Sequence, residues 1–135
     1  MPNREGQIDL RAIDAPDTRP SEEIPHPRAR YFEIQVANDS LSTTIAHVDN
    51  VTYVRWIDRI AELAGEALGH SRRELADRER MWFVARHEVD YLAETFAGDH
   101  IQAATWIHDA RKTACRRDTV LWRTSQTGPC LIANA

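Results

Sequence analysis

Apolar and polar residues alternate along residues 30–38, where Phe32, Ile34 and Val36 occupy every second position. A period of two is that of a β-strand with one buried face. The residues that follow, Asn-Asp-Ser at 38–40, are typical of a turn. The pattern therefore predicts a strand that begins near Arg30 and ends before this turn.

A helical period begins at about Asn50 and continues to Leu68. Apolar residues recur every three or four positions there, and only a narrow polar strip interrupts them. We therefore expect a largely buried helix, about 28 Å long at ~1.5 Å per residue. Asp49 or Asn50 suits the N-cap, and Gly69 suits the position after the helix end. The polar residues 70–80 predict a connector with room for a short helical turn.

The rest of the chain is strand-like. Residues 81–94 alternate, with Phe83, His87, Val89 and Tyr91 on one face, so we expect His87 to be a core histidine. Further strands are predicted at about 100–112, 114–126 and 130–135, and turns at 97–99 and 127–129. Short turns favour antiparallel pairing. The predicted class is α+β, an antiparallel sheet wrapped around one long buried helix.

The N-terminal segment has a different composition. Residues 1–28 hold five of the six prolines and many charges, so they disfavour a helix or a central strand. We predict an extended or partly disordered arm, or alternatively a segment that lies along a partner subunit. Residues 29–135 are predicted to form one domain, because 135 residues suit a single core.

Overall composition excludes several classes. Apolar residues make up 42% and charged residues 28%, with a net charge of -4, as in soluble globular proteins. No block of Lys or Arg asks for nucleic acid or an anionic membrane as partner. No apolar run approaches the roughly 20 residues of a membrane span or forms a secretory signal. We therefore expect a cytoplasmic protein in which Cys115 and Cys130 are reduced thiols.

Two motifs carry a family resemblance. The segment HVDNVTYVRWID (47–58) resembles the helix entrance of the 4-hydroxybenzoyl-CoA thioesterase-like acyl-CoA hydrolases, and FVARHEVDYLAETFAGD (83–99) resembles the next strand and Gly-Asp turn of that family. The similarity covers about residues 30–135. It implies the hotdog fold and hydrolysis of an acyl-CoA or acyl-carrier thioester, with no cofactor. It also implies a site shared between subunits of a homodimer or homotetramer.

The start of the helix is the expected binding region. A helix N-terminus offers free amides and a positive dipole end, which can stabilise the oxyanion of thioester hydrolysis. The resemblance places the amides near Val48, Asn50 and Val51 against the thioester carbonyl. Asn50 is either a cap or a polar wall of the pocket. Tyr53 and Trp56 are expected to line the acyl pocket, although a core role would also explain them.

The catalytic group is the open question. Relatives usually carry an acid four positions before His47, where this chain has Thr43. The candidates are Asp39 (alternatively an ordinary turn residue), Thr43, His47 (a general base, or packed near the helix start) and Glu88. Glu88 aligns with the carboxylate of the acyl-carrier-protein thioesterases, or faces solvent in an ion pair with Arg86. Without the usual acid, a non-hydrolytic protein that binds acyl thioesters is the alternative.

Other chemistries find little support in the sequence. His47, His87, His100 and His108 lack metal-ligand spacing, so no metal is expected. No Gly-rich phosphate loop or nucleophile elbow is present. The hydratase branch of the hotdog fold expects an acid five positions before the histidine, where this chain has Ser42. Dehydration is therefore disfavoured.

Overall fold

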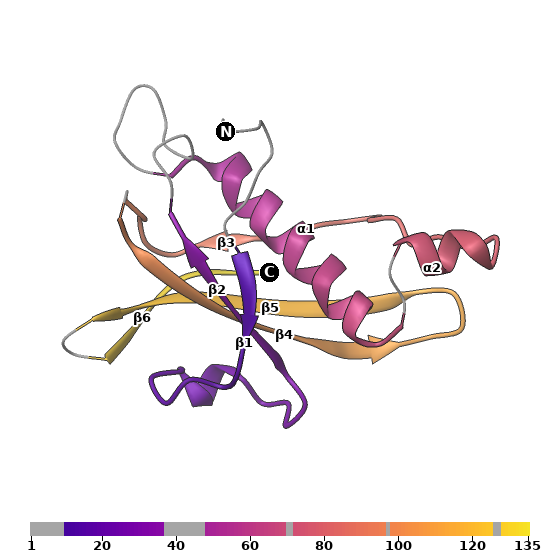
Figure 1. Ribbon diagram of the computed structural model, residues 1–135. Coiled ribbons are helices and arrows are strands. Elements are labelled where there is room, and N and C mark those ends of the chain that lie inside the picture. Colours follow the sequence, from indigo (N-terminus) through magenta and orange to yellow (C-terminus); the bar gives the residue numbers. More distant parts are fainter. Residues whose placement is uncertain (1–9, 37–47, 70–71, 97, 126–127) are drawn as a thin grey trace.

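The computed structural model describes residues 10–36, 48–69, 72–96, 98–125 and 128–135 (Figure 1). In chain order its elements are β1 (Leu10–Ile13), the 3-10 helix η1 (Ser21–Glu23), β2 (Arg30–Gln35), α1 (Asn50–Ala67), α2 (Arg72–Asp77), β3 (Asp90–Tyr91), β4 (His100–Ala110), β5 (Cys115–Ser125) and β6 (Gly128–Asn134). Among these residues no helix has both the length and the apolar character needed to cross a membrane.

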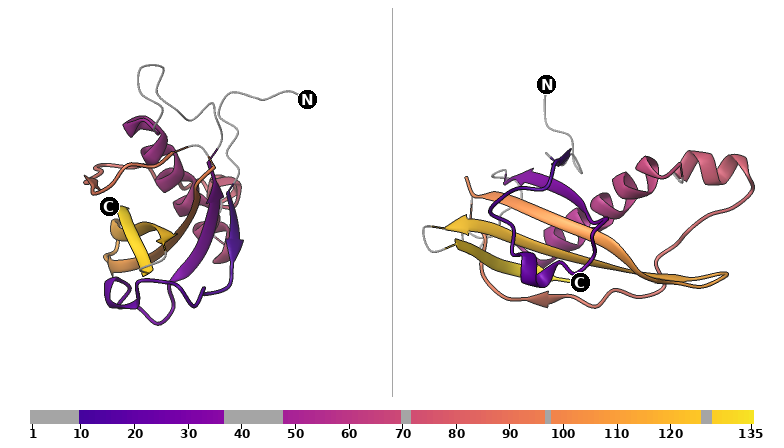
Figure 2. Two further views of the ribbon diagram at one scale, coloured as in Figure 1. Left: turned by 90° about the vertical axis from the view of Figure 1, so that its left-hand side faces the viewer. Right: turned by 90° about the horizontal axis from the view of Figure 1, so that it is seen from below.

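The strands form one six-stranded sheet in the order β1-β2-β4-β5-β6-β3. Every pair is antiparallel. Phe32 lies opposite Ala103 of β4, which in turn lies opposite Leu121 of β5. The sheet curls around α1, as the end-on view of Figure 2 shows. This confirms the predicted α+β class.

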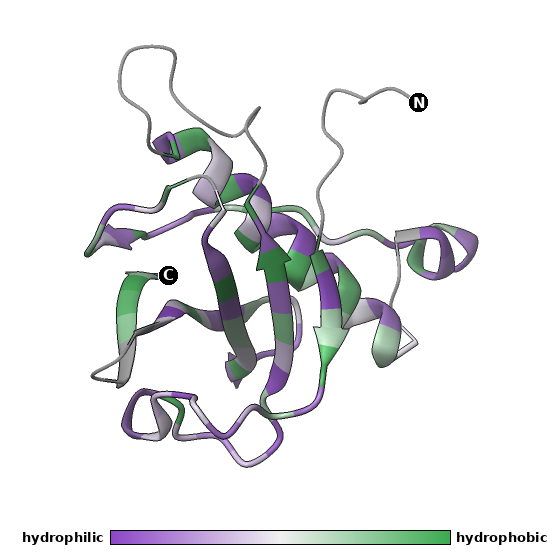
Figure 3. Cartoon of the chain, turned by 60° about the vertical axis from the view of Figure 1, so that its left-hand side comes forward, coloured by the Kyte–Doolittle hydropathy of each residue, from purple (hydrophilic) through white to green (hydrophobic). Residues whose placement is uncertain are grey.

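The main core lies between α1 and the concave face of the sheet. Its buried residues are Phe32, Ile34, Val36, Val48, Tyr53, Trp56, Ile57, Ile60, Ala64, Ile101, Ala103, Leu121, Ile132 and Ala133. Apolar bands recur along α1 and along the strands, each at the period of its own element (Figure 3). Burial of each large aliphatic side chain contributes about 1.5–3 kcal/mol to the stability of the fold. The apolar side chains at these two periods therefore hold the helix against the sheet.

A second, smaller core lies on the opposite face of the sheet. Trp106 and Trp122 are buried there with Ala104 and Val120, and Ile24 covers them from the segment that joins β1 to β2. The segment that joins β1 to β2 therefore contacts the outer face of the sheet through Ile24, and residues 10–13 form the edge strand β1.

Residues 81–94 differ from the sequence prediction. Only the two residues of β3 form a strand, paired with the end of β6, and Leu92 and Ala93 add hydrogen bonds to Ile132. No backbone group of residues 81–89 forms a hydrogen bond within the described part of the chain. Phe83 is 76% exposed, and His87 is exposed rather than part of the core. The predicted strand is wrong for residues 81–89, because alternation marks two faces but a strand also needs a neighbour for its backbone groups.

Candidate functional site

The start of α1 is capped by Asp49. Its carboxylate Oδ1 accepts hydrogen bonds from the Thr52 amide and the Thr52 hydroxyl, both at 2.9 Å. Asn50 is the first helical residue, and its exposed side chain is not the cap. The capping role considered for Asn50 is therefore wrong. Asp and Asn are equally good N-caps, so only the backbone angles decide between neighbours.

The capping pattern determines which amides remain available at this end. Val48 is 1% exposed, and its amide donates to the carbonyl oxygen of Thr95 at 2.8 Å. Thr52 donates to Asp49. Among the described residues, no acceptor lies on the amides of Asn50 and Val51. Of the expected oxyanion donors these two remain free, and Val51 is 62% exposed.

Tyr53 and Trp56 belong to the main core of this chain. They are 3% and 2% exposed, and their rings meet edge to face with centroids 5.4 Å apart. The Tyr53 hydroxyl donates to Thr95 Oγ1 at 2.7 Å. Burial raises the pKa of Tyr53 above its ordinary value of 10.0, and it outweighs the opposing effects of the Thr95 hydrogen bond and of Arg123. The phenol therefore stays protonated and donates.

Three further residues tie the helix start to the sheet, and sequence reasoning missed them. Thr95 is fully buried and accepts from both Val48 and Tyr53. The Tyr91 hydroxyl donates to the Asn50 carbonyl at 3.3 Å, and the Arg123 guanidinium donates to the Glu94 carbonyl. Threonine, tyrosine and arginine at these positions carry no distinguishing spacing. Their role depends on contacts 29 to 47 residues apart, which no local pattern reveals.

The candidate catalytic side chains have different outcomes. Asp39, Thr43 and His47 lie outside the described residues. Glu88 is exposed and lies 2.5 Å from the Arg86 guanidinium, in the surface ion pair considered as its alternative role. Within this chain, therefore, the described part of the site brings together the free amides, the capping carboxylate of Asp49 and core aromatics.

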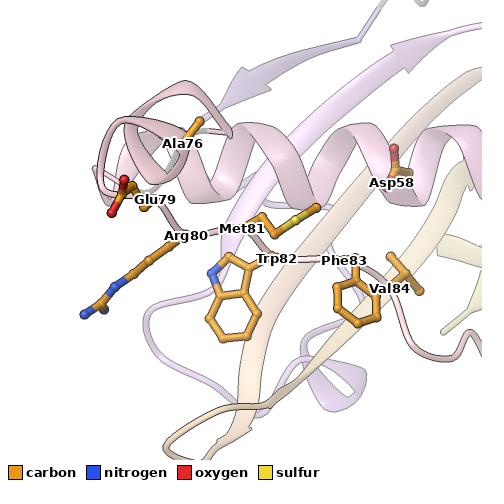
Figure 4. A pocket seen from close by; sticks show the side chains of 8 residues that line it. All are labelled: Asp58, Ala76, Glu79, Arg80, Met81, Trp82, Phe83 and Val84. Carbon is orange, nitrogen blue, oxygen red and sulfur yellow. The ribbon is translucent and has the colours of Figure 1, made fainter.

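An open pocket of about 640 Å³ lies between Asp58 of α1 and residues 76–84 (Figure 4). Its lining residues are Asp58, Ala76, Glu79, Arg80, Met81, Trp82, Phe83 and Val84. Asp58 lies nine residues beyond the cap, about 13 Å along the helix axis. The apolar part of the lining comes from residues 81–84, the same segment whose backbone lacks a strand partner. In the part of the chain that the structure describes, no three His, Cys, Asp or Glu side chains cluster as metal ligands.

Comparison with known proteins gives the fold a family. Residues 28–133 match the model of the thioesterase-like superfamily. The structure is similar to 4-hydroxybenzoyl-CoA thioesterase from Pseudomonas sp. strain CBS-3, with TM-score 0.70 and 15% identity over 79% of each chain. It is also similar to a thioesterase superfamily protein from Jannaschia sp. CCS1, with TM-score 0.65 and 20% identity over 84% of this chain and 69% of that one.

A third similar structure is a 1,4-dihydroxy-2-naphthoyl-CoA thioesterase from Synechocystis, with TM-score 0.64 and 15% identity over 78% of this chain and 76% of that one. Among curated protein sequences no relative matches. Identities this low establish the hotdog fold and leave the substrate open, whereas the family match covers most of the chain. The chain therefore belongs to the thioesterase-like superfamily, which supports thioester hydrolysis as its general chemistry.

Proposed function

We propose that the protein hydrolyses an acyl thioester whose carbonyl oxygen binds the amides of Asn50 and Val51. The observation that carries this is the pair of amides without an acceptor in the described chain, at the start of the core helix of a thioesterase-like chain. Negative charge develops on the carbonyl oxygen as the tetrahedral intermediate forms. Preorganised amides and the positive end of the helix stabilise that charge more than they stabilise the ground state.

The attacking water requires a base, and four side chains remain candidates. His47 is one residue before Val48, so its imidazole belongs to the same region of the chain as the free amides. An imidazole with an ordinary pKa near 6.5 is suited to take a proton at neutral pH. Asp39 and Thr43 precede it in the same segment. Glu88 can contribute only if a second subunit brings it to the helix start, since in one chain it pairs with Arg86.

The leaving thiol is proposed to be coenzyme A or an acyl carrier. Two of the similar structures are CoA thioesterases by name, which supports a CoA ester. An acyl carrier shares the same phosphopantetheine thiol, so the helix start would treat the two thioester carbonyls alike. We propose that the acyl group lies against α1 next to Tyr53 and Trp56, whose rings close the core there.

We propose that the site is completed by a second copy of the chain. Residues 81–89 present backbone groups that have no partner among the described residues, and four consecutive large apolar side chains, Met81 to Val84, each at least 54% exposed. An open edge of this kind pairs readily with another strand. Pairing between two copies would satisfy the backbone and cover the apolar side chains.

The charges along this edge are self-complementary. Arg86 and Glu88 flank His87, so an antiparallel pair with its two-fold axis at His87 places Arg86 of each copy opposite Glu88 of the other. In the same register Phe83 lies opposite Tyr91. Opposite charges across a strand pair stabilise it by roughly 0.2–1 kcal/mol, and like charges destabilise it.

A thiol-release assay tests hydrolysis. The purified protein is offered short-chain, long-chain and aromatic acyl-CoA esters, and released CoA is measured. We expect turnover with at least one class. His47→Ala, Asp39→Asn and Glu88→Gln then rank the candidate bases, with a loss of about 10²–10⁴-fold in kcat expected for the true one. Activity that survives all three changes would refute the proposed bases.

The alternative is a protein that binds acyl thioesters without hydrolysing them. The observation that favours it is Thr43 at the position of the usual acid, because a hydroxyl without an activating base is a weak nucleophile. Saturable binding of acyl-CoA esters by calorimetry, with no CoA released from any of them, would establish this alternative and exclude the hydrolase.

A further inference from the structure

One buried threonine connects the helix start to the segment that follows β3. Thr95 lies in residues 92–96, which follow β3, and is fully buried although it belongs to no strand or helix. Its carbonyl oxygen accepts the Val48 amide at 2.8 Å, and its hydroxyl oxygen accepts the Tyr53 phenol at 2.7 Å. The two contacts bracket the N-cap Asp49 and the free amides of Asn50 and Val51.

The segment that carries Thr95 is itself held firmly. Leu92 and Ala93 donate to the Ile132 carbonyl of β6 at 2.8 and 3.3 Å. The Arg123 guanidinium of β5 donates to the Glu94 carbonyl. The segment around Thr95 is therefore hydrogen-bonded to two strands of the sheet. The contacts of Thr95 with Val48 and Tyr53 then fix the position of the first turn of α1 relative to the sheet.

We propose that Thr95 is a positioning residue of the thioester site and that it aims the amides of Asn50 and Val51 at the carbonyl. The inference rests on the proposed function for its chemistry and on the two hydrogen bonds for its geometry. Oxyanion stabilisation depends on donors that are already in place when charge develops. A helix start tied on both sides of the free amides meets this condition, whereas a single N-cap bond within the helix leaves the first turn free to tilt.

The buried phenol makes the hydroxyl of Thr95 specifically necessary. Tyr53 is 3% exposed, so its hydroxyl has little access to water as an alternative acceptor. Without an acceptor, a buried phenol must move to find one. Tyr53 is three residues after Asn50 and two after Val51 in the same helical turn, so such a movement displaces both amides.

Thr95→Val tests the inference, because it preserves shape and removes only the hydroxyl. Thr95→Ser restores the hydroxyl. Thr105→Val is the control, because Thr105 is equally buried and its hydroxyl bonds only groups of β5: it donates to the Asp118 carbonyl at 2.9 Å, lies 3.0 Å from the Thr119 hydroxyl and accepts from Arg117 at 3.3 Å. Each full-length variant is assayed for kcat and KM with the acyl-CoA that wild type hydrolyses best. The backbone amide shifts of Val48, Asn50 and Val51 are recorded by NMR without ligand.

We expect Thr95→Val to lower kcat about tenfold with KM nearly unchanged, the factor that corresponds to one lost hydrogen bond. The three amide resonances should move in this variant, return in Thr95→Ser, and stay in place in Thr105→Val. A kcat for Thr95→Val equal to that of Thr105→Val, or a loss that serine does not rescue, would overturn the inference.

The two proposals fail separately. If wild type hydrolyses no acyl-CoA, the proposed function fails, and the amide shifts alone judge the positioning role: unchanged Asn50 and Val51 resonances in Thr95→Val would overturn it. If Thr95→Val does not fold, Tyr53→Phe replaces it, since this change removes the same hydrogen bond from the other partner. Loss of the phenol releases the first turn of α1 from the Thr95 hydroxyl, so the Asn50 and Val51 resonances should move relative to wild type, and unchanged resonances contradict the inference.

Discussion

At the scale of single residues, the ionisation of Tyr53 follows from its surroundings. Burial holds its pKa above the ordinary 10.0 in the folded chain. In the unfolded chain the phenol ionises near 10, so rising pH favours unfolding there. The contribution of Tyr53 to stability is therefore complete below about pH 10 and is lost as the pH rises toward the folded pKa. We expect the free energy of unfolding of wild type to fall above pH 10.

Tyr53→Phe isolates this effect. The variant loses the hydrogen bond to Thr95 and should be less stable at pH 7 by about 1 kcal/mol. Its stability should fall less steeply above pH 10, because Phe has no proton to lose. Urea unfolding at several pH values measures both effects. Tyr31→Phe serves as control and keeps the wild-type slope, since Tyr53 is still present. Equal slopes for wild type and Tyr53→Phe would contradict the assignment.

At the scale of an element, the N-cap decides how firmly α1 begins. Asp49 satisfies the Thr52 amide, one of the four at the helix start that lack intrahelical acceptors. Asp49→Ala should therefore destabilise the protein by about 1 kcal/mol, and Asp49→Asn by much less, since Asn is an equally good cap. Denaturant unfolding midpoints measure both. A loss of stability that is the same for Ala and Asn would show that the charge, rather than the cap, matters.

The elements also differ in how far local sequence could predict them. Phe32 and Ile34 alternate in β2, and the apolar stripe from Asn50 to Ala67 has the helical period, so both were predicted near their observed bounds. Residues 81–89 alternate in the same way as β2 and yet form no strand in this chain. The difference is a partner: β2 lies between β1 and β4, whereas residues 81–89 have no backbone hydrogen-bond partner within the described chain. Pairing is a long-range property that local alternation does not contain.

At the scale of the whole molecule, the open edge predicts self-association. We expect wild type to sediment as a dimer at micromolar concentration. Arg86→Glu places like charges opposite each other in the proposed register and should raise the dimer dissociation constant roughly tenfold, because each unfavourable pair costs up to about 1 kcal/mol. The exchange Arg86→Glu with Glu88→Arg restores opposite charges across the axis and should recover dimerisation.

The double variant is the decisive arm of this experiment. If Arg86→Glu weakens the dimer and the exchange does not restore it, the register centred on His87 is wrong even though the edge is used. A wild-type monomer at micromolar concentration would contradict the shared site itself. Phe83→Asp gives an independent check and should also weaken the dimer. Phe83 is 76% exposed in one chain, and the proposed interface would bury it.

The candidate site was predictable in part. The helix start was located from HVDN and the apolar period that follows, and its free amides lie there in the structure. The sequence left open whether Tyr53 and Trp56 line a pocket or belong to the core, because an aromatic residue on an apolar helix suits both roles. Packing places them in the core. Nothing in the sequence pointed to Thr95, since a threonine accepts hydrogen bonds from the helix start only when the chain folds back over that helix start.

The sequence by itself determined the helix, the strands with a clean alternation and the family, because these depend on residues a few positions apart and on short motifs. Only the tertiary structure decided that Asp49 caps the helix, that Thr95 holds its first turn, and that the segment joining β1 to β2 contacts the outer face of the sheet through Ile24. The last two depend on a buried group finding its partner across the fold, whereas the cap depends on the backbone angles at the helix start. The physical reason is that a hydrogen bond or an apolar contact is defined by distance in space, and the order of residues along the chain constrains that distance only weakly.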